Sequence, residues 1–252
     1  MAATAIKFQS HYFSNMEDIT PTADIISTFL KLFQDKKFLP NIFQEINPGS
    51  ITPENRIGLV SPNNEWIINI TRDRIVIQKN LLSFEKPNLG SIDEFAIEAK
   101  NFFKRILKEF PRNGTRISLV TTFATKQISD DKMQPIFKSL FMPPEFYSTN
   151  DSAEWQSKMV AKIPIRINEK KDMLNVISTL KWVKENPILY GLIPLFDLSV
   201  LANSVLIEFD INTHQNLKEP RISTSSIEEY FEIIIKTQKT LLNEWEQSFN
   251  VK

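Results

Sequence analysis

The chain of 252 residues has no cysteine, and this absence excludes several kinds of chemistry. Disulfides, cysteine-ligated zinc, iron–sulfur clusters and thiol nucleophiles all need a thiol group. Histidine is also scarce, because only His11 and His214 are present. These two do not recur at the spacing of metal ligands. We therefore expect no metal and no cofactor, and we assign no catalytic residue.

Glycine is the next shortage. Average usage of about 7% would give roughly 18 glycines in a chain of this length, whereas this chain has five, and no two of them lie close together. A phosphate cradle needs neighbouring glycines so that backbone N–H groups can approach the anion. Nucleotide-binding loops of the P-loop, dinucleotide and kinase types are therefore absent.

The chain also lacks an excess of charge, because thirty basic residues balance thirty acidic ones. A protein that grips a phosphate backbone usually carries a basic surplus, so we expect no nucleic-acid partner, although a local basic patch stays open. The first residues have no basic segment followed by an apolar run, which indicates a cytoplasmic protein. The apolar stretch 187–207 contains two prolines and lacks basic flanks, so it predicts a buried core segment rather than a membrane span.

What is present is a regular pattern of apolar residues. Alternation and β-branched residues predict strands, whereas apolar stripes that follow Thr20-Pro21, Ser91 and Ser225 predict capped helices. Pro164 indicates that its strand lies at the edge of a sheet. The predicted strands are 5–13, 39–46, 56–60, 65–71, 74–79, 116–126, 157–168, 172–183 and 204–212.

Short turns between neighbouring strands imply antiparallel pairing, and the helices must bury their apolar stripes on that sheet. We therefore predict the α+β class: a mostly antiparallel sheet with long amphipathic helices on one face. Residues 1–252 would form a single domain. Each half of the chain has several strands followed by a capped helix, which suggests two similar halves, 1–126 and 155–252, although no repeat of individual residues is evident.

The stretch "EWIINITRDRIVIQKN" raises the first question of function, because Arg72, Asp73 and Arg74 interrupt two apolar runs. Three charged residues in this position are typical of a hairpin turn. The alternative is that they form an exposed tip that binds a partner.

A second set of candidates lies in the C-terminal half. Asp197 is the one charge in an apolar stretch, where a carboxylate must be paired, protonated or beside a cavity. With Tyr190 it would line a ligand pocket. Glu208 and Asp210 alternate on one strand, where a solvent-exposed face is the simpler interpretation. A hydrolase that uses Asp197, Glu208, Asp210 or His214 is a further alternative.

The order of these segments resembles a sporadically distributed family of uncharacterised bacterial proteins of about this length. The resemblance is carried chiefly by "GLVSPNNEWIINITRDRIVIQKN". It implies a bacterial protein without established catalytic residues, in a family whose patchy occurrence suggests defence accessories, antitoxins or immunity proteins. We therefore favour a non-catalytic interaction protein that binds a protein partner, with no membrane. The alternative is a small-molecule-binding domain with an apolar pocket under the sheet. The sequence does not determine the oligomeric state.

Overall fold

The computed structural model describes residues 3–46, 52–83, 89–141, 143–150, 154–167, 169–183, 201, 203–214, 216–217 and 219–248. The strands in this part of the chain are β1 (Thr4–Phe13), β2 (Leu39–Glu45), β3 (Glu54–Val60), β4 (Trp66–Ile70), β5 (Arg74–Asn80), β6 (Arg116–Ala124), β7 (Glu154–Ile167), β8 (Lys170–Val183) and β9 (Val205–Thr213). The helices are α1 (Ala23–Leu32), α2 (Ile92–Glu109), α3 (Asp130–Phe141), α4 (Glu145–Thr149) and α5 (Ile227–Ser248), and a short 3-10 turn covers Gln34–Lys36.

The strands form one antiparallel sheet in the order β2-β3-β4-β5-β1-β6-β9-β8-β7. The predicted α+β class and antiparallel pairing are therefore confirmed. The stretch that begins at Asp172 is a strand, as its β-branched residues predicted. Pro164 lies in β7, which ends the sheet, so the prediction of an edge strand is also confirmed.

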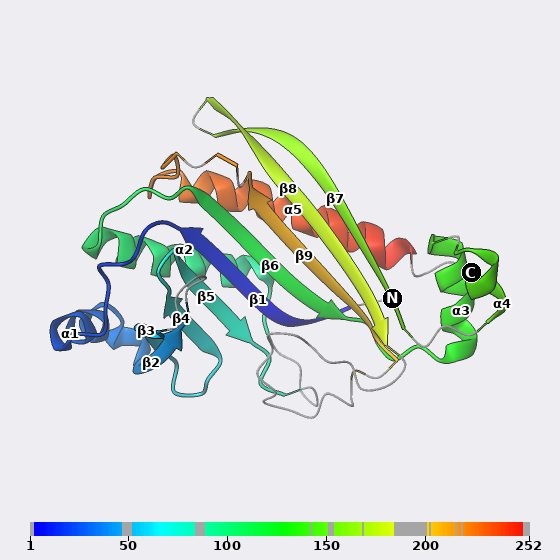
Figure 1. The fold of residues 1–252 in the computed structure, drawn as a ribbon, viewed down its shortest axis with the longest axis horizontal. Coiled ribbons are helices and arrows are strands. Elements are labelled where there is room, and N and C mark those ends of the chain that lie inside the picture. The colour runs from blue at the N-terminus through cyan, green and yellow to red at the C-terminus, as the bar shows by residue number, and fades with distance from the viewer. Residues whose placement is uncertain are drawn as a thin grey trace.

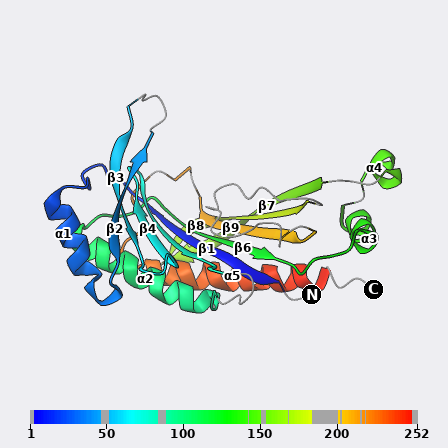
Figure 2. The ribbon, with the colours of Figure 1, turned by 90° about the horizontal axis from the view of Figure 1, so that it is seen from below.

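The two longest helices, α2 and α5, lie on the same face of the sheet (Figures 1 and 2). Two ion pairs join them: Lys104 Nζ lies 2.9 Å from Glu228 Oε2, and Lys239 Nζ lies 2.6 Å from Asp93 Oδ2. No described helix covers the opposite face, which we call the helix-free face. The β2–β3 hairpin projects from the sheet on that side (Figure 2).

The core fills the space between the sheet and these helices. Phe8 on β1 and Phe95 on α2 are almost fully buried, with ring centroids 5.5 Å apart. The indole ring of Trp66 on β4 stacks on the ring of Phe95, with centroids 5.5 Å apart. Each fully buried aromatic or aliphatic side chain contributes about 1.5 to 3 kcal/mol. Because side chains alternate along a strand, every second residue of the strands points to the helices, and the residues between them point to the helix-free face.

The starts of the helices differ in how far they follow the sequence pattern. Ser91 and Glu94 form the predicted capping box of α2. The cap of α1 is Thr22 rather than Thr20, because the backbone N–H of Ile25 donates to the Thr22 hydroxyl. At the start of α5 the hydroxyl of Ser225 lies 2.8 Å from that of Ser223 instead. The capping box predicted for Ser225 is therefore not among the described hydrogen bonds of α5.

Two parts of the chain share a similar order of elements, although the first also contains α1 and β2 and the second also contains α3 and α4. β1 is followed by the meander β3-β4-β5 and α2, and β6 is followed by the meander β7-β8-β9 and α5. β1 and β6 are neighbours at the centre of the sheet, and each meander extends outward from there. A division based on this order would fall between α2 and β6, whereas the sequence suggested halves of 1–126 and 155–252.

Candidate functional site

The charged triplet predicted as a turn or a partner-binding tip lies at the β4–β5 turn. Arg72 pairs with Glu17, and its backbone N–H donates to Glu45 Oε2 at 2.9 Å. Asp73 accepts from Arg74 Nε at 2.9 Å. These charges are largely occupied within the protein, which agrees better with a structural turn than with a binding tip. The role of the triplet as a partner site stays a prediction.

The other predicted ligand site, at Tyr190 and Asp197, lies outside the described residues. Most of the apolar stretch 187–207 lies there too. Among the described helices, none is both long enough and apolar enough to cross a bilayer.

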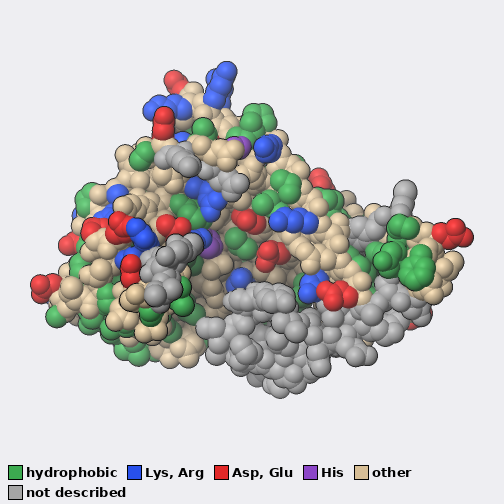
Figure 3. Space-filling view, in the orientation of Figure 1, with side chains coloured by type: hydrophobic (Ala, Val, Ile, Leu, Met, Phe, Trp, Pro, Cys, Tyr) green, Lys and Arg blue, Asp and Glu red, His purple; other side chains and the backbone are tan. Residues whose placement is uncertain are grey.

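The helix-free face carries a band of polar side chains over β1, β6, β9, β8 and β7, which we call the polar centre. The regular register aligns these side chains in rows across the strands. Basic and acidic side chains lie close together on this face (Figure 3). The rows of the polar centre are His11, Ser118, Asn212, Asn175 and Lys162; Gln9, Val120, Asp210, Ile177 and Val160; and Lys7, Thr122, Glu208, Thr179 and Lys158.

Burial shifts the pKa values of the ionisable groups in this band. Desolvation raises the pKa of Glu208, and the positive charges of Lys7 and Lys158 oppose that shift. Desolvation also raises the pKa of Asp210 and lowers the pKa of Lys7. Glu208 and Asp210 are partly buried, so the simpler interpretation of a solvent-exposed face does not hold. A strand periodicity of two shows which residues share a face, but it does not show that the face is recessed.

A pocket of about 260 Å³ opens at one end of the polar centre. Asn175 Nδ2 donates to Asn212 Oδ1 at 3.1 Å, and Asn212 Nδ2 donates to Asp210 Oδ1 at 3.0 Å. This chain of hydrogen bonds fixes the orientation of the Asp210 carboxylate. The described lining residues are Arg116, Val160, Lys162, Asn175, Ile177, Asp210, Asn212, His214 and Asn216.

His214 is brought to this pocket by a buried ion pair behind it. Arg221 Nε donates to Asp172 Oδ2 at 2.9 Å, and Arg221 Nη2 donates to the carbonyl of His214 at 3.3 Å. Tyr230 on α5 donates to the same Asp172 oxygen at 2.5 Å. His214 Nδ1 accepts from the backbone N–H of Asn216 at 3.1 Å, so the neutral ring carries its proton on Nε2.

These positions bring together only part of the set considered for hydrolysis. Asp210 and His214 line one pocket, whereas Glu208 lies one row further along β9. No described lining residue has a hydroxyl group that could act as a nucleophile. Within the described residues, no group of three or more acidic or histidine side chains is arranged to hold a metal.

The second candidate surface is the free edge of β7. The N–H of His214 donates to the carbonyl of Met173, so the peptide group of Met173 points to β9. Its partner on β7 is Pro164, whose peptide group therefore points away from β8. Because this direction alternates along a strand, the outward-pointing residues are Gln156, Lys158, Val160, Lys162, Pro164 and Arg166.

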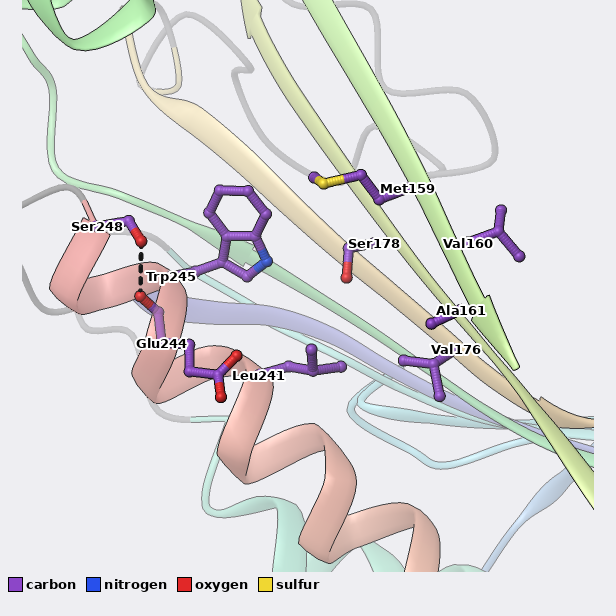
Figure 4. A pocket seen from close by; sticks show the side chains of 9 residues that line it. All are labelled: Met159, Val160, Ala161, Val176, Ser178, Leu241, Glu244, Trp245 and Ser248. Carbon is purple, nitrogen blue, oxygen red and sulfur yellow. Dashed lines mark hydrogen bonds between the residues drawn. The ribbon is translucent and has the colours of Figure 1, made fainter. Parts of the chain in front are cut away.

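An apolar pocket of about 320 Å³ lies beside this edge, between β7, β8 and the C-terminal half of α5 (Figure 4). Trp245 and Leu241 extend from the helix toward the strands, where Met159 and Val176 face them (Figure 4). Met159 is 41% exposed, so this pocket opens to solvent along the edge.

Sequence reasoning missed Arg116, Lys162 and Trp245 as site residues. The spacing of Lys158, Lys162 and Arg166 places three cations on one face of a strand, which was a usable signal. Arg116 and Trp245 gave no local signal, because their neighbours in the sites come from distant segments.

Comparison with models of known protein families and with curated proteins finds no match for this chain.

Proposed function

We propose that the protein binds a protein partner by accepting an extended segment of that partner as an additional strand beside β7. The observation that carries this proposal is a 14-residue edge strand whose outward peptide groups lie beside an apolar pocket. A strand added at such an edge gains main-chain hydrogen bonds, and its alternate side chains enter the neighbouring pocket. β2, at the other end of the sheet, is only 7 residues long.

The charges of β7 select the occupant. Lys158, Lys162 and Arg166 are exposed on the helix-free side of the strand. Two copies of β7 paired about Val160 would place Lys158 opposite Lys162, and like charges in that position are destabilising. A second copy of this chain is therefore disfavoured. The partner segment would carry acidic residues opposite the two lysines and apolar residues that point toward Trp245.

The test replaces one outward peptide group. Val160→Pro removes an outward N–H without affecting the ladder to β8, just as Pro164 already does, whereas Val160→Thr keeps the N–H. The probe is a synthetic peptide, acetyl-STEVVLETS-amide, with a control peptide in which lysine replaces both glutamates. We expect the acidic peptide to bind the wild type and Val160→Thr, and to bind Val160→Pro at least about tenfold more weakly.

Isothermal titration calorimetry measures these affinities. Equal binding of the lysine peptide, or undiminished binding to Val160→Pro, would contradict strand addition at this edge. Concentration-dependent dimerisation lost only in Val160→Pro would instead identify a second copy as the occupant.

An alternative function is the binding of a small apolar molecule in the pocket of Figure 4. The observation in its favour is the apolar lining, with Trp245 and Leu241 opposite Met159. Val160→Pro and Val160→Thr distinguish strand addition from small-ligand binding, because a small ligand in this pocket needs no hydrogen bond from the N–H of Val160. Such a ligand would raise the melting temperature of Val160→Pro and Val160→Thr equally.

The biological setting follows the resemblance described above. A partner-binding protein of the antitoxin, immunity or defence-accessory type in a bacterial cytoplasm is the setting that we propose. We also propose that the chain consists of two similar halves, supported by the repeated order of strand, meander and helix.

A further inference from the structure

Among the described residues no carboxylate forms an ion pair with Arg116, and the charges of Asp210 and Asp73 act on it only from a longer distance. No described residue accepts a hydrogen bond from its guanidinium, and its Nε is buried without a partner. The guanidinium carbon lies 3.6 Å from the centroid of the Phe13 ring, so it stacks on that ring. Arg74 lies 5.0 Å from the same ring and already pairs with Asp73. Arginine side chains held in this way are usually paired with a carboxylate or phosphate.

The surroundings of Arg116 carry a surplus of positive charge. Among the described residues, Arg116, Arg74 and the three lysines of the polar centre lie near three carboxylates, Glu208, Asp210 and Asp73. Asp73 is already paired with Arg74. Glu208 lies in the row that contains Lys7 and Lys158, which leaves Arg116 and Lys162 near Asp210. A charge that is partly removed from water and lacks a partner is unfavourable, so a bound anion would stabilise this region.

The pocket also contains groups that recognise more than a negative charge. Asp210 Oδ1 accepts from Asn212, and Oδ2 has no donor among the described residues. His214 presents Nε2–H as a donor. Arg116 and Lys162 line the same pocket as Asp210. The site therefore places two cations, a histidine N–H donor and an oriented carboxylate around one small cavity.

We propose that this pocket binds a free α-amino acid, with its carboxylate paired to Arg116 and Lys162 and its ammonium group paired to Asp210. The volume of about 260 Å³ is below the roughly 300 to 1,000 Å³ typical of sites for drug-sized ligands, which indicates a small occupant. A simple anion would place a second negative charge beside the Asp210 carboxylate, whereas an amino acid also brings a positive charge. The pocket shares Val160 and Lys162 with the outward-pointing residues of β7, but an amino-acid site goes beyond the proposed partner binding.

The experiment uses L-alanine as the probe, with three analogues that each change one group. Propionate lacks the ammonium group, lactate replaces it with a hydroxyl, and alaninamide lacks the carboxylate. Binding to the full chain is measured by NMR chemical-shift titration. We expect L-alanine to bind at least about tenfold more tightly than each analogue, because each analogue loses a charged hydrogen bond.

Variants locate the site. We expect Arg116→Gln and Lys162→Gln each to weaken L-alanine binding, and Asp210→Asn to remove the preference for L-alanine over propionate. Arg166→Gln is the control, because it removes an exposed cation of β7 that does not line the pocket. Circular dichroism shows whether each variant is folded. If Arg116→Gln does not fold, Lys162→Gln still tests the site.

Three results would overturn the proposal. They are the absence of L-alanine binding at millimolar concentration, equal binding of propionate and L-alanine to the wild type, and equal loss of binding in Arg166→Gln. The second result would identify a site for simple anions only.

Discussion

His11 on β1 illustrates how a single residue depends on the sheet around it. Burial lowers the pKa of His11 to about 3, and the positive charges of Arg74, Arg116 and Lys7 add to that shift. The ring stacks on Phe13 with centroids 5.7 Å apart, and its Nδ1 has no partner among the described residues. The imidazole is therefore neutral in the folded protein at physiological pH.

This shift predicts a loss of stability in mild acid. Below about pH 6.5 the unfolded chain binds a proton at His11 that the folded chain does not bind until the pH nears its lowered pKa. Stability contributed by the neutral ring is therefore lost as the pH falls through this window. Between about pH 7.5 and 4.5, the wild type should lose about 2 to 3 kcal/mol more unfolding free energy than His11→Gln.

Urea unfolding of the wild type and His11→Gln across this pH range measures the difference. The contribution of the carboxylates to the pH dependence is common to both proteins and largely cancels in the difference. The same pH dependence in His11→Gln would show that the histidine is accessible to protons in the folded state.

At the scale of single elements, the capping boxes of α2 and α5 separate a pattern that forms from one that does not. In α2 the backbone N–H of Ser91 donates to Glu94 Oε2 at 2.8 Å, and the N–H of Glu94 donates to the Ser91 hydroxyl at 3.2 Å. Ser225 has the same spacing to a glutamate, but its hydroxyl contacts Ser223. The local sequence signal is thus not sufficient by itself to form a capping box.

Alanine substitutions distinguish these two serines. Ser91→Ala should lower the unfolding free energy by about 1 kcal/mol, within the usual 0.5 to 2 kcal/mol for a lost N-cap. Ser225→Ala should change it by less than about 0.5 kcal/mol, as for most surface substitutions. Thermal or urea unfolding gives both values, and equal losses would show that the α5 box forms in solution.

For the molecule as a whole, we predict that the chain divides into two parts near residue 113. Arg112 Nη1 lies 2.9 Å from Asp18 Oδ1 in the first part. Gly114 exchanges backbone hydrogen bonds with Ile222 in the second. The hydroxyl of Tyr12 donates to the carbonyl of Ile222 at 2.7 Å, and with the β1–β6 ladder it joins the two parts.

Fragments cut at this point should reassemble. Residues 1–113 and 114–252, produced together, are expected to form a soluble one-to-one complex through the β1–β6 ladder and the α2–α5 ion pairs. Each fragment alone exposes an apolar central strand and should aggregate. Co-purification through a tag on one fragment measures this, with a cut after residue 126 as the control that severs β6 from its meander. Better assembly from the control cut would support the division suggested by the sequence.

The sequence by itself determined the elements that depend on neighbouring residues. Alternation predicted the strands, including β8, and the proline in β7 indicated an edge, because these signals arise from local backbone chemistry and burial on one face. The Ser91 cap followed for the same reason. The α+β class came from adding these local predictions together.

Only the tertiary structure decided the candidate sites. Arg116 from β6, His214 after β9 and Lys162 from β7 meet because β9 pairs with both β6 and β8. Trp245 reaches the edge of β7 because α5 returns across the sheet. Pairing between strands far apart in the chain depends on the packing of the whole sheet, and the periodicity of a single strand carries no record of its neighbours.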